Sequence, residues 1–462
     1  MPDTSARKIL ISGLLALVTF TSANAEPLSI KQFIEKAAAH DKQFEAILID
    51  QMGLQYRRDQ LLPDSDLVLD VKYQHNFYLD QDRNDPEASI SLSKLFSNSG
   101  TELSLNYGKD SSVFNTTENA NLELLVSQPI ANNAFGKASQ LQDKIIGVEN
   151  DVIRYQVIEA YEDYLASLTT IYYNWYSAYQ NLKLGKLSLQ SNKKLMENIL
   201  ERQRQKIALP IDVNKMRLLL LAREENLISL QEDYDTYNNL IHRSSGQPSS
   251  SLYTPLEPEN AMELSALKND ITALIEGSRS FKIFSMLEQQ NTLELEKVAD
   301  GLMPSTQLLF GYRIDGEDWD IGSNQDNLFA GISMSWPLGQ TVNKASKQLA
   351  QIALRKTQAS NESKISELHT RLKNIALQIH RQQKLVTISN QKIELSKAIL
   401  KDEAENYSFG KVSLNDYITA VNRGDENQFS LTAHKVELSK LMIEWLRLTD
   451  QLVNESVLKK LQ

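Results

Sequence analysis

The segment Ser127-Gln128-Pro129 recurs in the second half of the 462-residue chain as Ser335-Trp336-Pro337. In the same order, Lys137-Ala138-Ser139 recurs as Lys344-Ala345-Ser346, and Leu209-Pro210-Ile211-Asp212-Val213 is answered by Val412-Ser413-Leu414-Asn415-Asp416-Tyr417. Three landmarks in one order, each repeated after roughly 205 residues, indicate an internal duplication. We therefore divide the chain into a first structural repeat (26–243), a linker (244–261) and a second structural repeat (262–462).

Strands are predicted before the proline landmark of each repeat. Residues 67–77 alternate strictly, with an apolar face made by Leu67, Leu69, Val71, Tyr73 and Phe77. The same alternation predicts strands over 122–126, 307–314 and 328–336, the last two separated by an acidic turn at 315–318. The stretch before the landmark is longer in the first repeat, which has room for one extra hairpin at residues 88–108.

Long helices are predicted after each landmark. The apolar residues follow a heptad seam in the first repeat, which comprises Val157, Tyr161, Tyr164, Leu168, Ile171, Trp175, Ala178, Leu182 and Leu189. This seam predicts a helix over about 138–206, roughly 100 Å long at 1.5 Å per residue, and a return helix to about residue 241. The second repeat predicts a helix over 343–407 and a return helix to about 452. Shorter helices are predicted over 28–62 and 262–300.

The N-terminus has the pattern of a cleaved signal peptide over residues 1–25. Arg7 and Lys8 precede an apolar run, and Ala23-Asn24-Ala25 forms a small-residue cleavage site. The rest of the chain has no apolar run long enough for a membrane-spanning helix. The formal net charge of −10 argues against nucleic acid as a partner.

Amphipathic strands on an exported chain have two interpretations. In a soluble sandwich the apolar face packs on another sheet, and about seven strands are usual. In a transmembrane barrel that face meets lipid, and at least about eight strands are needed. Four strands, or six with the extra hairpin, suffice for neither in one chain. If the strands enter a membrane, several copies must therefore share one barrel. The alternative is a secreted or periplasmic coiled-coil stalk without a channel.

The order and spacing of these landmarks resemble the TolC-like outer-membrane efflux protein family, over residues 28–452. The resemblance rests on Leu28-Ser29-Ile30, on the Ser-Gln-Pro and Ser-Trp-Pro strand ends, and on the helical-hairpin tips. It implies a mainly α fold with membrane β-structure: a homotrimer with a shared 12-stranded β-barrel and a periplasmic α-helical barrel. It also implies the outer membrane of a Gram-negative bacterium, with a periplasmic adaptor protein and, indirectly, an inner-membrane transporter as partners.

The resemblance also implies a gate at the periplasmic end. The family pattern of Gly, five residues and Asp is kept by Gly410 and Asp416, which Tyr407 precedes. By resemblance, Tyr407, Asp416 and Asp212 help to close the tunnel. Thr419 stands where some members have a second acidic residue. For both aspartates, a role in capping their own helices is the alternative.

The hairpin tips are rich in small and apolar residues, for which an adaptor contact is one explanation and packing of one tip on the next is the other. These residues are Ala208, Leu209, Pro210, Ile211, Phe409, Gly410, Val412 and Leu414. In the first tip, Lys206 takes the place of the glycine. The sequence has no phosphate-binding loop and no metal-ligand spacing of its histidines, so we expect no enzymatic activity, cofactor or metal.

Overall fold

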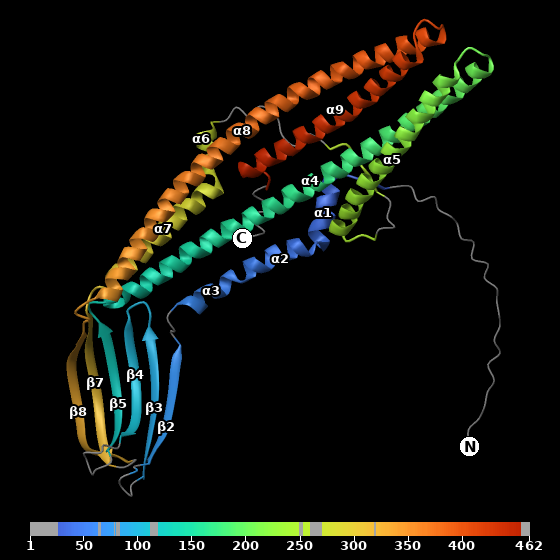
Figure 1. Cartoon of the computed structure of the whole chain (residues 1–462). Coiled ribbons are helices and arrows are strands. Elements are labelled where there is room, and N and C mark those ends of the chain that lie inside the picture. Colours follow the sequence, from blue (N-terminus) through green and yellow to red (C-terminus); the bar gives the residue numbers. More distant parts are fainter. Residues whose placement is uncertain are drawn as a thin grey trace, which may run out of the picture. The chain divides into compact units, whose positions relative to one another are not determined.

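A computed structural model describes residues 26–62, 66–77, 79, 84–110, 119–248, 253–258, 270–317 and 320–453 (Figure 1). The predicted signal peptide at 1–25 lies outside these residues. As predicted, the described chain is mainly helical and carries one substantial β-sheet.

The sheet has six strands, all antiparallel, in the order β2-β3-β4-β5-β7-β8. Their bounds are β2 (Leu67–Phe77), β3 (Asn84–Phe96), β4 (Thr101–Asp110), β5 (Asn119–Pro129), β7 (Ser305–Glu317) and β8 (Asp320–Ser335). Figure 1 shows the strands of both repeats side by side. Residues 88–108 therefore lie in β3 and β4, inside the sheet. The turn predicted at 315–318 is wrong for residues 315–317, which belong to β7. Asp315 and Gly316 pair with β5.

Two very long helices follow the proline landmarks. α4 (Lys137–Arg204) and α8 (Thr341–Ser408) return through α5 (Pro210–Ser245) and α9 (Leu414–Leu448). All of the predicted α4 seam is buried except Ile171, which is half-buried. The heptad spacing thus identified the packed face of this helix, because residues three and four apart share one side.

The shorter helices differ from the prediction. The helix expected over 28–62 is three helices, α1 (Ile30–His40), α2 (Lys42–Met52) and α3 (Leu54–Leu61). Asp41 ends α1 with an extended backbone, which suits a side chain that competes for backbone hydrogen bonds. The helix expected over 262–300 is α6 (Ile271–Gly277) and α7 (Arg279–Asp300), with 262–269 outside the described residues. Ser278 separates them, since its hydroxyl caps α7.

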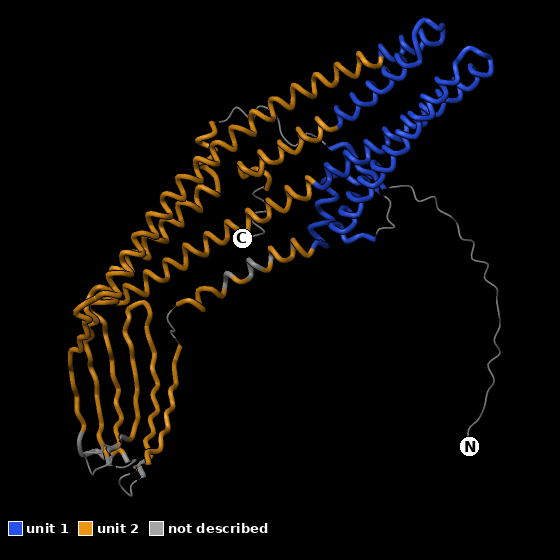
Figure 2. Tube along the Cα trace, viewed as in Figure 1, with its two compact units in different colours: residues 1–41, 171–259, 398–432 blue, residues 42–170, 260–397, 433–462 orange. Residues whose placement is uncertain are grey.

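Contacts divide the chain into two compact units that cut across the repeats (Figure 2). The first comprises residues 1–41, 171–259 and 398–432. There β1 (Glu26–Leu28) pairs in parallel with β6 (Tyr253–Pro255), a strand within the predicted linker. The hydroxyl of Tyr172 on α4 donates to the backbone oxygens of Leu28 and Leu256, which fastens this small sheet to the long helix.

The second unit comprises residues 42–170, 260–397 and 433–462 and contains the six-stranded sheet. One apolar cluster joins α6, α8 and α9 through Ile275, Leu372, Ile375, Ile379 and Trp445. Glu162 on α4 also forms an ion pair with Arg279 at the start of α7 and accepts from the backbone N–H of Val453. Val453, just beyond α9, is thereby held against α4.

The two long helical hairpins share backbone features. Gly410 has φ 70°, a left-handed conformation that glycine adopts readily, and Lys206 has φ 59° at the matching place in the first tip. The turn η1 (Ala134–Gly136) precedes α4 and contains positive φ at Phe135 and Gly136, while Gln340 precedes α8 with φ 48°. Both hairpin ends and both helix starts therefore use the same unusual backbone geometry.

Within the described residues, no helix combines the length and the apolar character needed to cross a bilayer.

Candidate functional site

The first hairpin tip joins α4 to α5. Pro210 opens α5, where its fixed φ and missing N–H suit the first helical position. The Asp212 carboxylate accepts from the backbone N–H of Leu209 at 3.1 Å, so it satisfies a donor at the start of its own helix. This is the capping role that the sequence left open for Asp212.

The second tip joins α8 to α9 in the same manner. The Asp416 carboxylate accepts from the Ser413 hydroxyl at 2.6 Å and from the Ser413 backbone N–H at 3.2 Å. These hydrogen bonds lower the pKa of Asp416, because they stabilise the charged form. Asp416 is fully exposed, so it remains an accessible negative charge as well as a cap. The Thr419 hydroxyl donates within its own helix, to Asn415.

The two tips pack against each other. A buried cluster joins Leu195, Ile199, Val213 and Met216 of the first hairpin to Leu414 of the second. Ala208, Tyr407 and Tyr417 pack against its surface. Leu414, 5% exposed, is therefore a packing residue. The neighbouring tip covers the Leu414 side chain, which is the tip-to-tip packing that the sequence left open beside an adaptor contact.

Tyr407 is the aromatic centre of this contact. Its ring stacks on Tyr417 at 5.5 Å between centroids, and the Arg202 guanidinium lies 4.8 Å from the ring centre. Burial raises the pKa of Tyr407, and the negative charge of Asp212 adds to the effect while Arg202 opposes it. The structure therefore brings two of the predicted gate residues, Tyr407 and Asp212, into one neighbourhood.

Arg202 was missed by the sequence reasoning. It also donates to the backbone oxygen of Ser408 at 3.4 Å. Arg202 therefore contacts both the Tyr407 ring and the backbone of the second hairpin. Val412, in the second tip, is apolar and half-buried, so it offers no such charge. Arg202 lies one helical turn before the first tip. Its nearness to the tip is the one sequence feature that could have marked it as a candidate.

A second polar contact links the hairpins further along the helices. Asp425 on α9 accepts from the Ser188 hydroxyl of α4 at 2.5 Å and pairs with Arg223 of α5 at 3.0 Å. Arg223 also donates to Asn422. The Arg223–Asp425 pair is largely shielded from solvent, so breaking it would leave a poorly solvated charge. No sequence pattern had singled out these residues.

The remaining tip residues differ in exposure. Leu209, Ile211 and Phe409 are 57–67% exposed, and Pro210 and Gly410 are exposed as well. Ile207, which was not in the predicted set, is 60% exposed beside them. These residues form an apolar tip surface: Ile207, Leu209, Pro210, Ile211, Phe409 and Gly410. Four bulky apolar side chains are therefore exposed at two adjacent hairpin ends, a composition typical of surfaces that bind another molecule.

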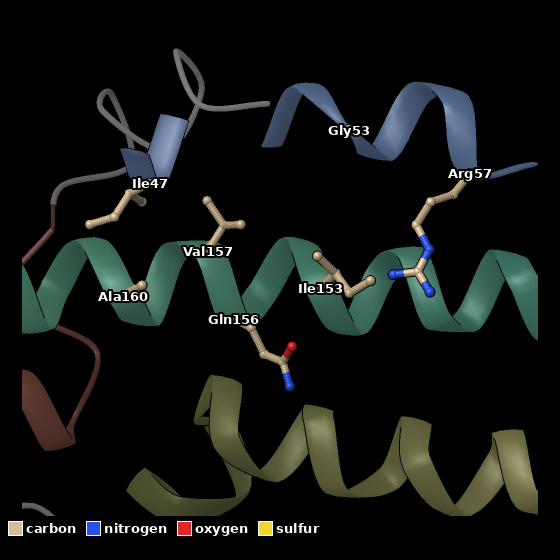
Figure 3. A pocket seen from close by; sticks show the side chains of 7 residues that line it. All are labelled: Ile47, Gly53, Arg57, Ile153, Gln156, Val157 and Ala160. Carbon is tan, nitrogen blue, oxygen red and sulfur yellow. The ribbon is translucent and has the colours of Figure 1, made fainter. Parts of the chain in front are cut away.

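Elsewhere, a hollow of roughly 510 Å³ lies between α2, α3 and α4 (Figure 3). Its one charged lining residue, Arg57, is paired with Glu149 at 2.7 Å. The other lining side chains are apolar or amide groups. Among the described residues, no group of three or more His, Asp or Glu side chains is arranged to hold a metal. The hollow therefore offers no set of groups for acid–base chemistry.

No protein-family model matches the sequence, and no curated protein sequence matches it either. Solved structures do match. The fold is similar to that of the outer-membrane protein VceC from Vibrio cholerae, with a TM-score of 0.71 and 14% identity over 91% of this chain and 95% of that one. It is also similar to the outer-membrane channel OprN, with a TM-score of 0.72 and 15% identity over 91% of this chain and 89% of that one.

The Campylobacter jejuni outer-membrane channel CmeC matches over 99% of this chain and 97% of its own, with a TM-score of 0.64 and 13% identity. Likenesses at this level of identity establish the fold, and the high coverage in both directions means that the likeness extends over nearly the whole of each chain. The chain therefore has the fold of the TolC-like outer-membrane efflux proteins, as the sequence predicted.

Proposed function

We propose that this protein is the outer-membrane exit duct of a tripartite efflux or type I secretion system. It acts as a homotrimer in a Gram-negative outer membrane, after its signal peptide is removed. The duct is a passive conduit. It is gated at its periplasmic end and opens when a periplasmic adaptor, driven by an inner-membrane transporter, engages the tips. Drugs, metal ions and proteins are the three cargo classes that this plan can serve.

The observation that carries the proposal is the division of the sheet into an apolar and a polar face. Side chains on one face are exposed and apolar from the first strand to the last: Leu67, Leu69, Val71, Tyr73, Phe77, Ile90, Leu103, Leu105, Leu124, Phe310, Tyr312, Leu328, Ile332 and Met334. An apolar surface of this extent is unfavourable in water and suits a lipid bilayer.

Polar contacts cross the strands on the opposite face. Arg313 on β7 forms an ion pair with Glu123 on β5, and Ser91 on β3 donates to Asn106 on β4. Asn76 on β2 donates to Glu87. Such groups need water or hydrogen-bonding partners, which a lumen supplies and a hydrocarbon layer does not. This second face supports a water-filled interior.

Membrane fractionation tests the membrane assignment. We expect the mature protein to stay with outer membranes through a high-salt wash and to be released only by detergent. Release by salt as a stable soluble monomer would contradict the proposal and favour the stalk alternative, because ionic contacts are screened by salt and burial in lipid is not.

The gate is tested by ion conductance in planar bilayers. We expect the double variant Asp212→Ala with Asp416→Ala to conduct more than the wild type, since both carboxylates stabilise the closed tips. Ser413→Ala is the matched control, because it removes a hydrogen bond from the same helix start and keeps both carboxylates. Equal conductance of the double variant and the wild type would remove the gate assignment. An equal rise in Ser413→Ala would show that helix capping is responsible.

The apolar tip surface is tested by adaptor binding. We expect Leu209→Asp with Phe409→Asp to abolish co-purification with the cognate adaptor, because charges replace exposed apolar contacts at both tips. Ile228→Asp is the control, since Ile228 is 71% exposed on α5 and lies outside the tip surface. Unchanged co-purification of the tip variant would contradict the assignment.

A further inference from the structure

The sheet ends at two strands that have a partner on one side only within the described residues. These are β2 and β8, at opposite edges of the six. Both carry the apolar face to the edge, with Val71 67% exposed on β2 and Ile332 70% exposed on β8. In a bilayer, each unpaired backbone group on such an edge costs several kcal/mol, so the edges require partners.

The register of the sheet shows which residues of these two edges are level. Leu67 pairs with Lys94, and the ladder continues through Leu103, Val126 and Phe310 to Ala330 on β8. A line that follows the hydrogen bonds across the strands therefore joins Leu67 to Ala330, five strand spacings away.

When the sheet closes into a ring of tilted strands, the residue that faces Ala330 on β2 of the next copy is no longer Leu67 but one further along the strand. For six strands about 4.8 Å apart and tilted by about 40°, the displacement along the strand direction is about 24 Å. This corresponds to about seven residues at about 3.3 Å each. The shift must be even, because an odd shift would turn the apolar side chains to the polar face. The shift must also go from Leu67 toward the C-terminal end of β2, because the same shift in the other direction would reach α3.

We propose that β8 of one copy pairs antiparallel with β2 of the next, with Ala330 opposite Tyr73 or His75, and that three copies close an eighteen-stranded ring. The proposal rests on the homotrimer of the proposed function and deepens it. The partner of each sheet edge is a second copy of this chain. The pairing continues the apolar face without interruption, since Tyr73 and Leu69 then lie level with Ala330 and Met334 at a shift of six.

The ring is wider than the twelve-stranded barrel that the resemblance implied. At the same spacing and tilt, eighteen strands enclose a backbone diameter of about 36 Å, against about 24 Å for twelve. The difference comes from the hairpin at 88–108, which lies within the sheet as part of β3 and β4. The extra hairpin therefore sets the width of the lumen.

Cysteine cross-linking tests the pairing, and the chain suits it because it has no cysteine of its own. Ala330→Cys is combined with Tyr73→Cys and, separately, with His75→Cys, and outer membranes are oxidised before non-reducing electrophoresis. We expect one of these pairs to give a ladder that ends at the trimer, because directly opposed strand residues meet the distance limits of a disulfide. The single variants must show no ladder.

Ala330→Cys with Leu67→Cys is the matched control. These positions are level in one copy but five strands apart, so no cross-link is expected within a chain or at the proposed shift. A ladder from this control, or none from either test pair, would overturn the register. A ladder that ends at the dimer would overturn the eighteen-stranded ring, because two copies supply twelve strands.

Electron-microscope images of the unmodified, detergent-solubilised protein measure the diameter of the ring and need no variant. We expect three-fold particles with a ring about 36 Å across its backbone. A trimeric ring about 24 Å across would overturn the strand count and leave the proposed function intact. A soluble monomer without a ring would instead contradict the proposed function itself.

Discussion

The buried cluster between the hairpin tips yields the sharpest prediction. Ile199 on α4 is 0% exposed and belongs to the cluster that joins both hairpins. Ile199→Ala removes three carbons and leaves a cavity, and large-to-small changes of this kind typically cost about 2–5 kcal/mol. The cost falls on local opening of the tips, because the whole cluster lies within about three helical turns of the hairpin ends.

Amide hydrogen exchange measures that opening directly. Because a factor of ten corresponds to about 1.4 kcal/mol, the exchange of protected tip amides should accelerate by roughly 30-fold or more. The acceleration should extend to the start of α9, since Leu414 belongs to the same cluster. Ile207→Ala is the control: this side chain is 60% exposed at the same tip, and its loss should change exchange little.

Two results would refute this reasoning. Equal exchange in Ile199→Ala and Ile207→Ala would show that the cluster does not stabilise the tips. Faster exchange on α4 with unchanged exchange at Leu414 would show that the hairpins are not packed as one unit in the membrane-bound protein.

Two further predictions concern stability. Gly136→Ala should lower the unfolding temperature, because φ is +78° there and a Cβ would lie 2.7 Å from the Asn98 backbone oxygen; the left-handed backbone alone costs about 1–2 kcal/mol. Gly147→Ala, with nothing within 4 Å of the new Cβ, should be neutral or stabilising, and equal melting of the two variants would contradict this. Burial alone would raise the pKa of Glu444, but the hydrogen bond and charge of Arg447 hold it below its usual 4.5. Its contribution to stability is therefore present above pH 4.5 and lost as the pH falls through the lower, folded-state pKa. Glu444→Gln should flatten the acid branch of a melting-temperature profile, and an unchanged acid branch would count against the ion pair.

Much of the fold could be read from local patterns. Alternation in 67–77 identified β2 to the residue, and the heptad seam identified the buried face of α4. These features are set within one element or one turn, where side-chain period and backbone conformation are linked directly. Where helices were misjudged, at Asp41 and Ser278, single polar residues ended them against the apolar period.

The partners of each element were decided only by the tertiary structure. Sequence alone did not show that β5 pairs with β7 across the repeats, or that β2 and β8 are the edges. It also did not show that Arg202 meets Tyr407 or that Arg223 meets Asp425. Each of these contacts joins residues at least 178 positions apart. A period records which face an element buries, whereas the identity of the neighbour on that face depends on how distant elements pack, which no local pattern encodes.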